Sequence, residues 1–380
     1  MVFEPTRGDL PARFGPGIPH VPPIGPATLD AHVYRNPHRY HHERTHILNQ
    51  SWQIICRSEQ IPHPGDHHVW TGHGESIVIT RRNDGGLTGF HNVCQHRGAR
   101  IVATSGTGAR RYTCRWHNWT YDTEGKLTGV PDRPDFDRDT LKNLCAPPLD
   151  LDEWGGWIWA VLDGPGTAGT LTDWLGPDIT GDLGAFHMQD MKLFEKIEWT
   201  VNVNWKICID AFSEYYQAQA LHHIPAQDAV DLRESRIDVS GRHGVMVQPM
   251  AGVLEELTES LDHQNLAVCN YQIFPTAVFS AHRMHTQLFR AVPLAVDETR
   301  FEVWELQYDT DDEDYLDAIE MFWAVFKGVV AENLRQWEDV AATQDSSAYR
   351  RNVLSERECL ITHFHRTCDE MLAPALAATD

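Results

Sequence analysis

The stretches NVCQHRGAR at residues 92–100 and TCRWHNWTY at residues 113–121 decide the fold predicted for this chain. Each short stretch holds one cysteine and one histidine: Cys94 lies beside His96, and Cys114 beside His117. Seventeen residues separate His96 from Cys114. Thiolates and imidazoles are soft to borderline metal ligands. The spacing therefore predicts a metal centre held by two loops that each contribute one sulfur and one nitrogen ligand.

The mixed ligand pairs indicate which metal centre this is. Zinc fingers usually group like ligands, two cysteines and then two histidines. In a Rieske [2Fe–2S] centre, two histidines replace two cysteines on one iron and raise the reduction potential. Mixed loops suit that centre, because one iron takes both cysteines and the other takes both histidines. Structural zinc remains the less favoured alternative.

The residues around the two loops fit a buried inorganic cluster. Gly98 permits a tight turn after the first loop. We expect Trp116, Trp119 and Tyr121 to wall the second loop from water, and residues 122–126 (DTEGK) to form a hairpin turn behind it.

Short β patterns surround the loops, and a second, mixed pattern follows them. Residues 76–80, 87–92 and 154–161 predict strands split by turn signals, so residues 46–165 read as a small all-β domain. Residues 1–45 predict an extended arm and a short helix packing on the second domain. Residues 166–380 predict an α+β domain, with strands at 198–203, 277–281 and 300–308 and helices at about 205–221 and 313–343.

Composition and charge exclude several classes of partner. The chain has 380 residues and a formal net charge of −22, which argues against nucleic acid and anionic membranes. The sequence has neither a signal-peptide pattern nor an apolar run of membrane-spanning length, so we expect a cytoplasmic protein. It also lacks the glycine-rich loops of nucleotide-binding proteins, and reducing power must then come from another protein.

The run from Ser51-Trp52-Gln53 through the two loops resembles the α subunit of Rieske non-haem iron ring-hydroxylating oxygenases. This resemblance implies a Rieske domain joined to a helix-grip catalytic domain, an antiparallel sheet gripped by helices. It implies Cys94, His96, Cys114 and His117 as cluster ligands. It also implies trimers, electron transfer between subunits, and a reductase or ferredoxin as electron donor. The usual second loop has Gly where this chain has Asn118.

The resemblance also implies a mononuclear iron site, and here the sequence departs from the family. Non-haem Fe(II) oxygenases hold iron with two histidines and one carboxylate. Residues 204–206 (NWK) and 210–216 (DAFSEYY) match the family pattern, which places Gln217 at the first histidine position and His222 at the second. Glu214 stands where the family has a carboxylate that bridges to the neighbouring subunit's Rieske histidine. A two-histidine set through His222 and His223 is a less favoured alternative.

The third ligand of that site is expected on the helix at 313–343. The aligned residue is Asn333, and Asp339 is a competing candidate. At about 100° per residue, Asn333 lies about 60° from Val330 on the apolar face, whereas Asp339 lies about 180° from it. Asn333 should therefore point inward, and Asp339 and Glu332 should be solvated.

The aligned set Gln217, His222 and Asn333 is neutral, and two of its donors are amides. We therefore predict weak or absent Fe(II) at this position. Two functions follow. The first is an oxygenase that passes electrons from the Rieske centre to a mononuclear metal and hydroxylates or demethylates a small organic substrate, aromatic rings included. The second is a non-catalytic or electron-relaying subunit, in a homotrimer or a hetero-oligomer with a related α subunit.

The other cysteines have no partner at ligand spacing, and no carboxylate at ligand spacing supports a site among the histidines of the N-terminal helix. We read the remaining six cysteines as small core or near-core residues. The histidines at positions 38, 41, 42 and 46 read as a solvated helix face.

Overall fold

The computed structural model describes residues 21–217, 230, 235–249, 267–282 and 284–377. The chain divides into two compact units. The large unit combines Met1–Ile47 with Leu175–Asp380, and the small unit is Leu48–Trp174. The small unit is therefore an insertion in the sequence of the large one.

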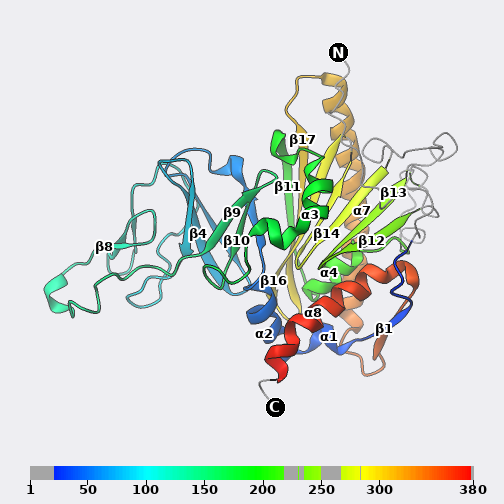
Figure 1. The fold of residues 1–380 in the computed structure, drawn as a ribbon, viewed down its shortest axis with the longest axis horizontal. Coiled ribbons are helices and arrows are strands. Elements are labelled where there is room, and N and C mark those ends of the chain that lie inside the picture. The colour runs from blue at the N-terminus through cyan, green and yellow to red at the C-terminus, as the bar shows by residue number, and fades with distance from the viewer. Residues whose placement is uncertain (1–20, 218–229, 231–234, 250–266, 283, 378–380) are drawn as a thin grey trace. The chain divides into compact units, whose positions relative to one another are not determined.

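The small unit is built from short antiparallel strands in three sheets, ordered β2-β10-β9, β3-β4-β5 and β6-β7-β8 (Figure 1). Their bounds are β2 Gln53–Arg57, β3 His67–Gly72, β4 Glu75–Arg81, β5 Leu87–His91, β6 Tyr112–Thr113, β7 Thr120–Tyr121, β8 Leu127–Gly129, β9 Asp150–Trp154 and β10 Trp157–Val161.

The large unit holds one seven-stranded antiparallel sheet in the order β11-β17-β16-β15-β14-β13-β12. Its strands are β11 Met191–Val201, β12 Arg236–Ser240, β13 His243–Pro249, β14 Ala267–Ile273, β15 Ala277–Ala281, β16 His285–Ala295 and β17 Glu298–Tyr308. Its helices are α1 His32–Arg35, α2 Pro37–Glu43, α4 Trp205–Ala211, α7 Glu313–Thr343 and α8 Cys359–Ala377. The α3 helix, Leu171–Gly184, crosses the unit boundary and is kinked at Gly176.

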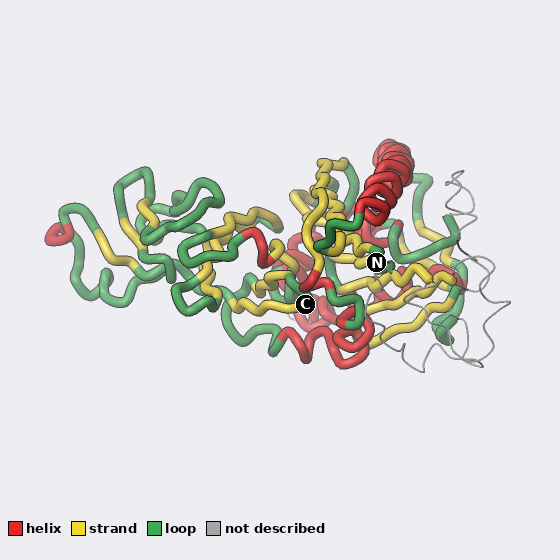
Figure 2. Tube along the Cα trace, turned by 90° about the horizontal axis from the view of Figure 1, so that it is seen from above, coloured by secondary structure: helices red, strands yellow, loops and turns green. Residues whose placement is uncertain are grey.

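The long α7 helix lies along one face of this sheet (Figures 1 and 2). Its buried residues recur at helical spacing, and aromatic rings carry the contact. Trp337 packs on Phe301 of β17, with ring centroids 4.9 Å apart. Phe212, just after α4, stacks on Phe289 of β16 at 4.2 Å. These contacts fix α4 and α7 against the sheet and place the residues after α4 near the C-terminal third of α7.

The N-terminal segment packs as part of the large unit. Strand β1, Ala27–Asp30, pairs antiparallel with β18, Arg351–Leu354. Helix α2 starts at Pro37 with Asn36 as its cap and continues into a π-helical turn, Arg44–Leu48. The side chain of Glu43 enters the core, where it accepts from Lys206 Nζ at 2.7 Å, and both side chains are fully buried.

The predicted α+β class, an all-β unit beside an antiparallel sheet with helices, is confirmed, and the strand at 277–281 and the helix at 313–343 end where predicted. Two predictions were wrong. Residues 154–161 are not one strand, because Gly155 and Gly156 have φ angles of 63° and 74° and make a hairpin turn between β9 and β10. The helix predicted over 205–221 ends at Ala211, where Phe212 leaves helical geometry.

Candidate functional site

The two cysteine–histidine loops have the same backbone construction. The amide of Gly98 donates to the carbonyl of Cys94, and the amide of Asn118 donates to that of Cys114, both at 2.9 Å. The cysteine amides in turn donate to the carbonyls of Ala99 and Trp119, both at 2.8 Å. Each cysteine therefore begins a closed turn that directs its side chain and the following histidine to the same place.

Both turns need a residue with positive φ at the corresponding position. Gly98 has φ 77° and Asn118 has φ 57°. The left-handed region suits glycine and, among other residues, asparagine best. The departure of Asn118 from the usual glycine therefore keeps the loop geometry.

The loops bring like ligands together. Cys94 and Cys114 are both buried, and burial together with the neighbouring Cys114 thiol raises the pKa of Cys94. The rings of His96 and His117 lie with centroids 4.4 Å apart. Among the residues that the structure describes, no three His, Cys, Asp or Glu side chains converge on a single ion position. The pairing of two thiols and of two imidazoles is what a two-iron cluster of this type requires.

The local contacts also fit a cluster between the loops. Nδ1 of His96 is buried and has no hydrogen-bond partner, as expected of a nitrogen that ligates a metal. The ring of His96 stacks on Trp119 at 4.7 Å and 9°. The hydroxyl of Tyr121 lies 3.3 Å from Sγ of Cys94 and accepts from the amide of Gln95 at 2.9 Å.

The core of the small unit holds the loops in place. The Asn92 side chain is buried: its Oδ1 accepts from the amides of Ile101 and Val102, and its Nδ2 donates to the Val102 carbonyl at 2.7 Å. Trp119 and Tyr121 are buried, as predicted. The prediction for Trp116 was wrong, because this side chain is 54% exposed, although the Arg97 guanidinium lies 4.5 Å and the His117 ring 4.7 Å from its ring.

The predicted mononuclear position lies between the segment after α4 and the C-terminal third of α7. Asn333 is buried, as predicted, and Asp339 is exposed. Nε2 of Gln217 donates to the Ala211 carbonyl at 2.6 Å and lies 3.4 Å from Oδ1 of Asn333. Nδ2 of Asn333 donates to the Val329 carbonyl at 3.1 Å. The structure thus brings Gln217 and Asn333 together, whereas His222 lies outside the described residues.

Glu214 faces the backbone beside this amide pair. Its carboxylate accepts from the amide of Gln217 at 3.0 Å. Burial raises the pKa of Glu214 to about 7, although the bond from the Gln217 amide acts in the opposite direction.

The described residues at this position do not fit a mononuclear iron ion. Fe(II) in these sites takes imidazole and carboxylate ligands. Gln217 and Asn333 carry no charge, and their amide NH₂ groups already bind backbone carbonyls. Oδ1 of Asn333 faces Nε2 of Gln217 rather than an open coordination position.

A buried network missed by the sequence reasoning lies behind α4. Asp210 Oδ2 accepts from the Tyr34 hydroxyl at 2.6 Å and lies 3.0 Å from Nε2 of His365. Burial, followed by the Asp210 charge, raises the pKa of Tyr34. These residues come from α1, α4 and α8, and no local sequence signal joins segments so far apart.

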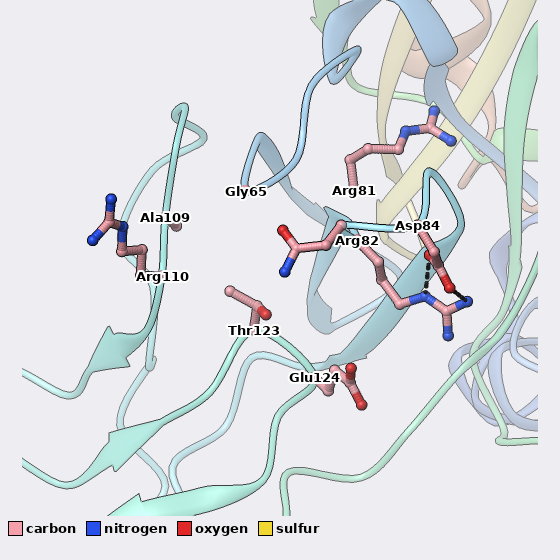
Figure 3. Close-up of a pocket in the computed structure, with 9 residues that line it drawn as sticks. Gly65, Arg81, Arg82, Asp84, Ala109, Arg110, Thr123 and Glu124 are labelled. Carbon is pink, nitrogen blue, oxygen red and sulfur yellow. Dashed lines mark hydrogen bonds and ion pairs between the residues drawn. The ribbon is translucent and has the colours of Figure 1, made fainter.

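The small unit also has a polar cleft of about 350 Å³ between its loops (Figure 3). Its lining is Gly65, Arg81, Arg82, Asn83, Asp84, Ala109, Arg110, Thr123 and Glu124, which includes none of the four loop ligands. Arg82 is paired with Asp84 at 2.7 Å, so its charge is already compensated.

Fold and site together define a protein with a Rieske [2Fe–2S] domain and an oxygenase-type catalytic domain. The family described as "Rieske [2Fe-2S] domain" matches residues 51–144, and "Ring hydroxylating alpha subunit (catalytic domain)" matches residues 188–374. The chain belongs to the α subunits of the Rieske non-haem iron ring-hydroxylating oxygenases.

Relatives include the biphenyl 2,3-dioxygenase subunit alpha of Rhodococcus jostii, which is 29% identical over 54% of this chain and 46% of its own length. The carnitine monooxygenase oxygenase subunit of Acinetobacter baumannii is 27% identical over 50% of this chain and 51% of its own. The chain thus matches about half the length of these curated relatives.

Solved structures share the fold over nearly the whole chain. A quaternary ammonium Rieske monooxygenase in complex with L-carnitine has a TM-score of 0.76 at 21% identity, covering 95% of this chain and 99% of its own. A naphthalene 1,2-dioxygenase from Rhodococcus sp. has a TM-score of 0.71 at 21% identity, covering 91% and 94%. In the described part of the chain, no helix is both long and apolar enough to cross a membrane.

Proposed function

We propose that this chain is the oxygenase component of a Rieske system, an oxidoreductase for the O₂-dependent hydroxylation or demethylation of a small organic molecule. The observation that carries the proposal is the pairing of Cys94 with Cys114 and of His96 with His117 on two matching loops. When bound there, a [2Fe–2S] cluster supplies one-electron transfer.

Residues of this chain would shield the proposed cluster and adjust its reduction potential. Trp119 and Tyr121 exclude water from one side, and the Tyr121 hydroxyl can donate to Sγ of Cys94. A hydrogen bond to a ligand sulfur stabilises the reduced, more negative cluster and so raises its reduction potential. The small unit is therefore suited to accept electrons from a donor protein.

The proposed partners are a reductase or ferredoxin, O₂ and a small organic substrate, in a cytoplasmic homotrimer or hetero-oligomer. Relatives named for biphenyl and for carnitine support a small organic substrate, aromatic or not. Glu214 is proposed as the carboxylate that couples this unit to the Rieske histidine of a neighbouring subunit.

A second function is favoured by the amide pair at the mononuclear position. Gln217 and Asn333 bind each other and the backbone, which supports an α-type subunit that keeps the Rieske centre and relays electrons. The O₂-activating metal would then belong to a related α subunit in the same assembly.

Iron counting with electron paramagnetic resonance on the purified, dithionite-reduced protein tests both functions. Three irons per chain with a reduced-Rieske signal would support the oxygenase. Two irons with the same signal would support the relay subunit. Zinc without iron would contradict both.

A further inference from the structure

The stretch HHERTH at residues 41–46 has no role in the function proposed above. It spans the end of α2 and the π-helical turn Arg44–Leu48. In the structure, His42 and His46 lie one turn apart with stacked rings, centroids 5.9 Å apart and planes inclined by 19°. Both side chains are half-buried and so remain accessible to solvent.

Residues 42–46 also match the H-E-x-x-H pattern of zinc peptidases, in which two histidines one turn apart bind zinc and the glutamate acts as base. The structure rules out that use of Glu43. Its carboxylate is fully buried and accepts from Lys206 Nζ at 2.7 Å, Arg39 Nε at 2.8 Å and Trp205 Nε1 at 3.2 Å. It cannot reach a water molecule on a metal at the helix surface.

His42 and His46 keep the metal-binding part of the H-E-x-x-H pattern. With Glu43 directed into the core, residues 42 and 46 lie about 60–100° around the helix from it, on one side. Arg39, the neighbouring cation on α2, is compensated by Glu43 and by Asp369, each at 2.8 Å. A cation bound at the helix surface therefore does not face an uncompensated Arg39.

We propose that His42 and His46 form a binding site for a borderline divalent cation such as Zn²⁺, Ni²⁺ or Cu²⁺. Neutral imidazole is a preferred ligand of these ions. At Zn–N distances of about 2.1 Å, two nitrogens on one tetrahedral ion lie about 3.4 Å apart. Histidines four residues apart on a helix are neighbours on its surface, which is the spacing that binds zinc in the H-E-x-x-H pattern. The described residues offer no third His, Cys, Asp or Glu ligand, so water completes the coordination.

The location gives the site a structural effect. The π-helical turn ends at Leu48, the first residue of the small unit. π-helical turns are uncommon and are enriched at functional sites. A cation bridging residues 42 and 46 fixes the last turn of the large unit's N-terminal helix before the chain enters the small unit.

The site is tested by titrating the cluster-loaded protein with Zn²⁺ in a calorimeter and with Cu²⁺ by electron paramagnetic resonance of the oxidised protein. We expect one Zn²⁺ site that His46→Ala weakens by about tenfold or more, which is 1.4 kcal/mol or more in binding free energy. The wild-type Cu²⁺ spectrum should show coupling to nitrogen ligands, reduced in His46→Ala.

His41→Ala is the matched control, because His41 is exposed on the same helix and its ring is inclined by 69° to that of His42. It should bind Zn²⁺ like the wild type. Equal weakening by His41→Ala and His46→Ala would overturn the assignment, as would a Zn²⁺ affinity unchanged in His46→Ala. The Rieske signal and iron content should be the same in all variants, so this result is independent of the proposed redox function.

Discussion

Asn118 shows how one residue can depart from a family pattern and keep its geometry. It occupies the left-handed region with φ 57°, at the position that matches Gly98 in the first loop. The sequence revealed the departure, but only the backbone angle explains why it is tolerated.

Asn118→Gly should stabilise the small unit by about 0.5–1 kcal/mol, because glycine adopts positive φ without steric cost. Asn118→Ala should destabilise it, since alanine lacks the polar side chain that makes positive φ tolerable. Thermal unfolding of the cluster-loaded protein, followed at the visible cluster absorbance, measures both. Equal stability of the two variants would contradict this account of the loop.

Tyr121→Phe should lower the reduction potential of the cluster, because it removes the hydroxyl 3.3 Å from Sγ of Cys94. A redox titration followed by electron paramagnetic resonance measures the change. Tyr112→Phe is a suitable control, since its hydroxyl binds Thr80 Oγ1 at 2.8 Å rather than a cluster ligand. An unchanged potential in Tyr121→Phe would show that the hydroxyl does not act on the cluster.

At the scale of elements, buried charges hold helices and strands together. Lys206 on α4 and Glu43 on α2 form a fully buried ion pair. Lys206→Met should destabilise the large unit by about 3–5 kcal/mol, because it leaves the Glu43 carboxylate buried beside fewer cations. Urea unfolding measures the loss. The double variant Glu43→Leu, Lys206→Met should recover much of it, and failure to recover would show that the cost is one of packing.

A second buried charge makes the sheet sensitive to acid. Burial would raise the pKa of Glu302 on β17, but the charges of Arg290, Lys196 and Arg300 hold that pKa at about 2. In the unfolded chain it is about 4.3. Because the folded pKa is the lower one, the stabilisation is present above about pH 4.3 and is lost as pH falls toward 2.

Above about pH 4.3, where its carboxylate is ionised in both states, Glu302 contributes about 3 kcal/mol to the free energy of unfolding. Glu302→Gln should therefore remove part of the pH dependence of stability between pH 5 and pH 3. Urea unfolding at several pH values measures the slope for both proteins. Parallel curves for wild type and variant would contradict the assignment.

The sequence predicted some elements and site residues more completely than others. Helix α7 was predicted to its ends because its apolar residues recur at one spacing over many turns, and the structure adds that the Asp312 side chain caps its start. The end of α4 was missed because Ala211 is followed by aromatic residues that pack as well outside a helix as inside one. The four candidate cluster ligands were predicted from their spacing, whereas the Tyr34–Asp210–His365 network joins residues that only the tertiary fold brings together.

At the scale of the whole molecule, the mononuclear position decides which function the two units perform. Gln217→His with Asn333→Asp should raise iron by about one ion per chain, since it restores an imidazole and a carboxylate. Iron analysis beside the Rieske signal measures this. Gln217→His with Asp339→Asn is the control, because Asp339 is exposed and should not ligate. No gain in iron would count against the placement of Gln217 and Asn333.

The pairing of β1 with β18 sets an order of events during synthesis. Residues 27–30 find their partners only when residues 351–354 have left the ribosome, more than three hundred residues later. The small unit, Leu48–Trp174, needs no later segment to complete its sheets. Because domains fold as units during translation, the small unit can fold and load its metal centre before β1 pairs with β18. Cluster assembly can thus precede closure of the large unit on each nascent chain.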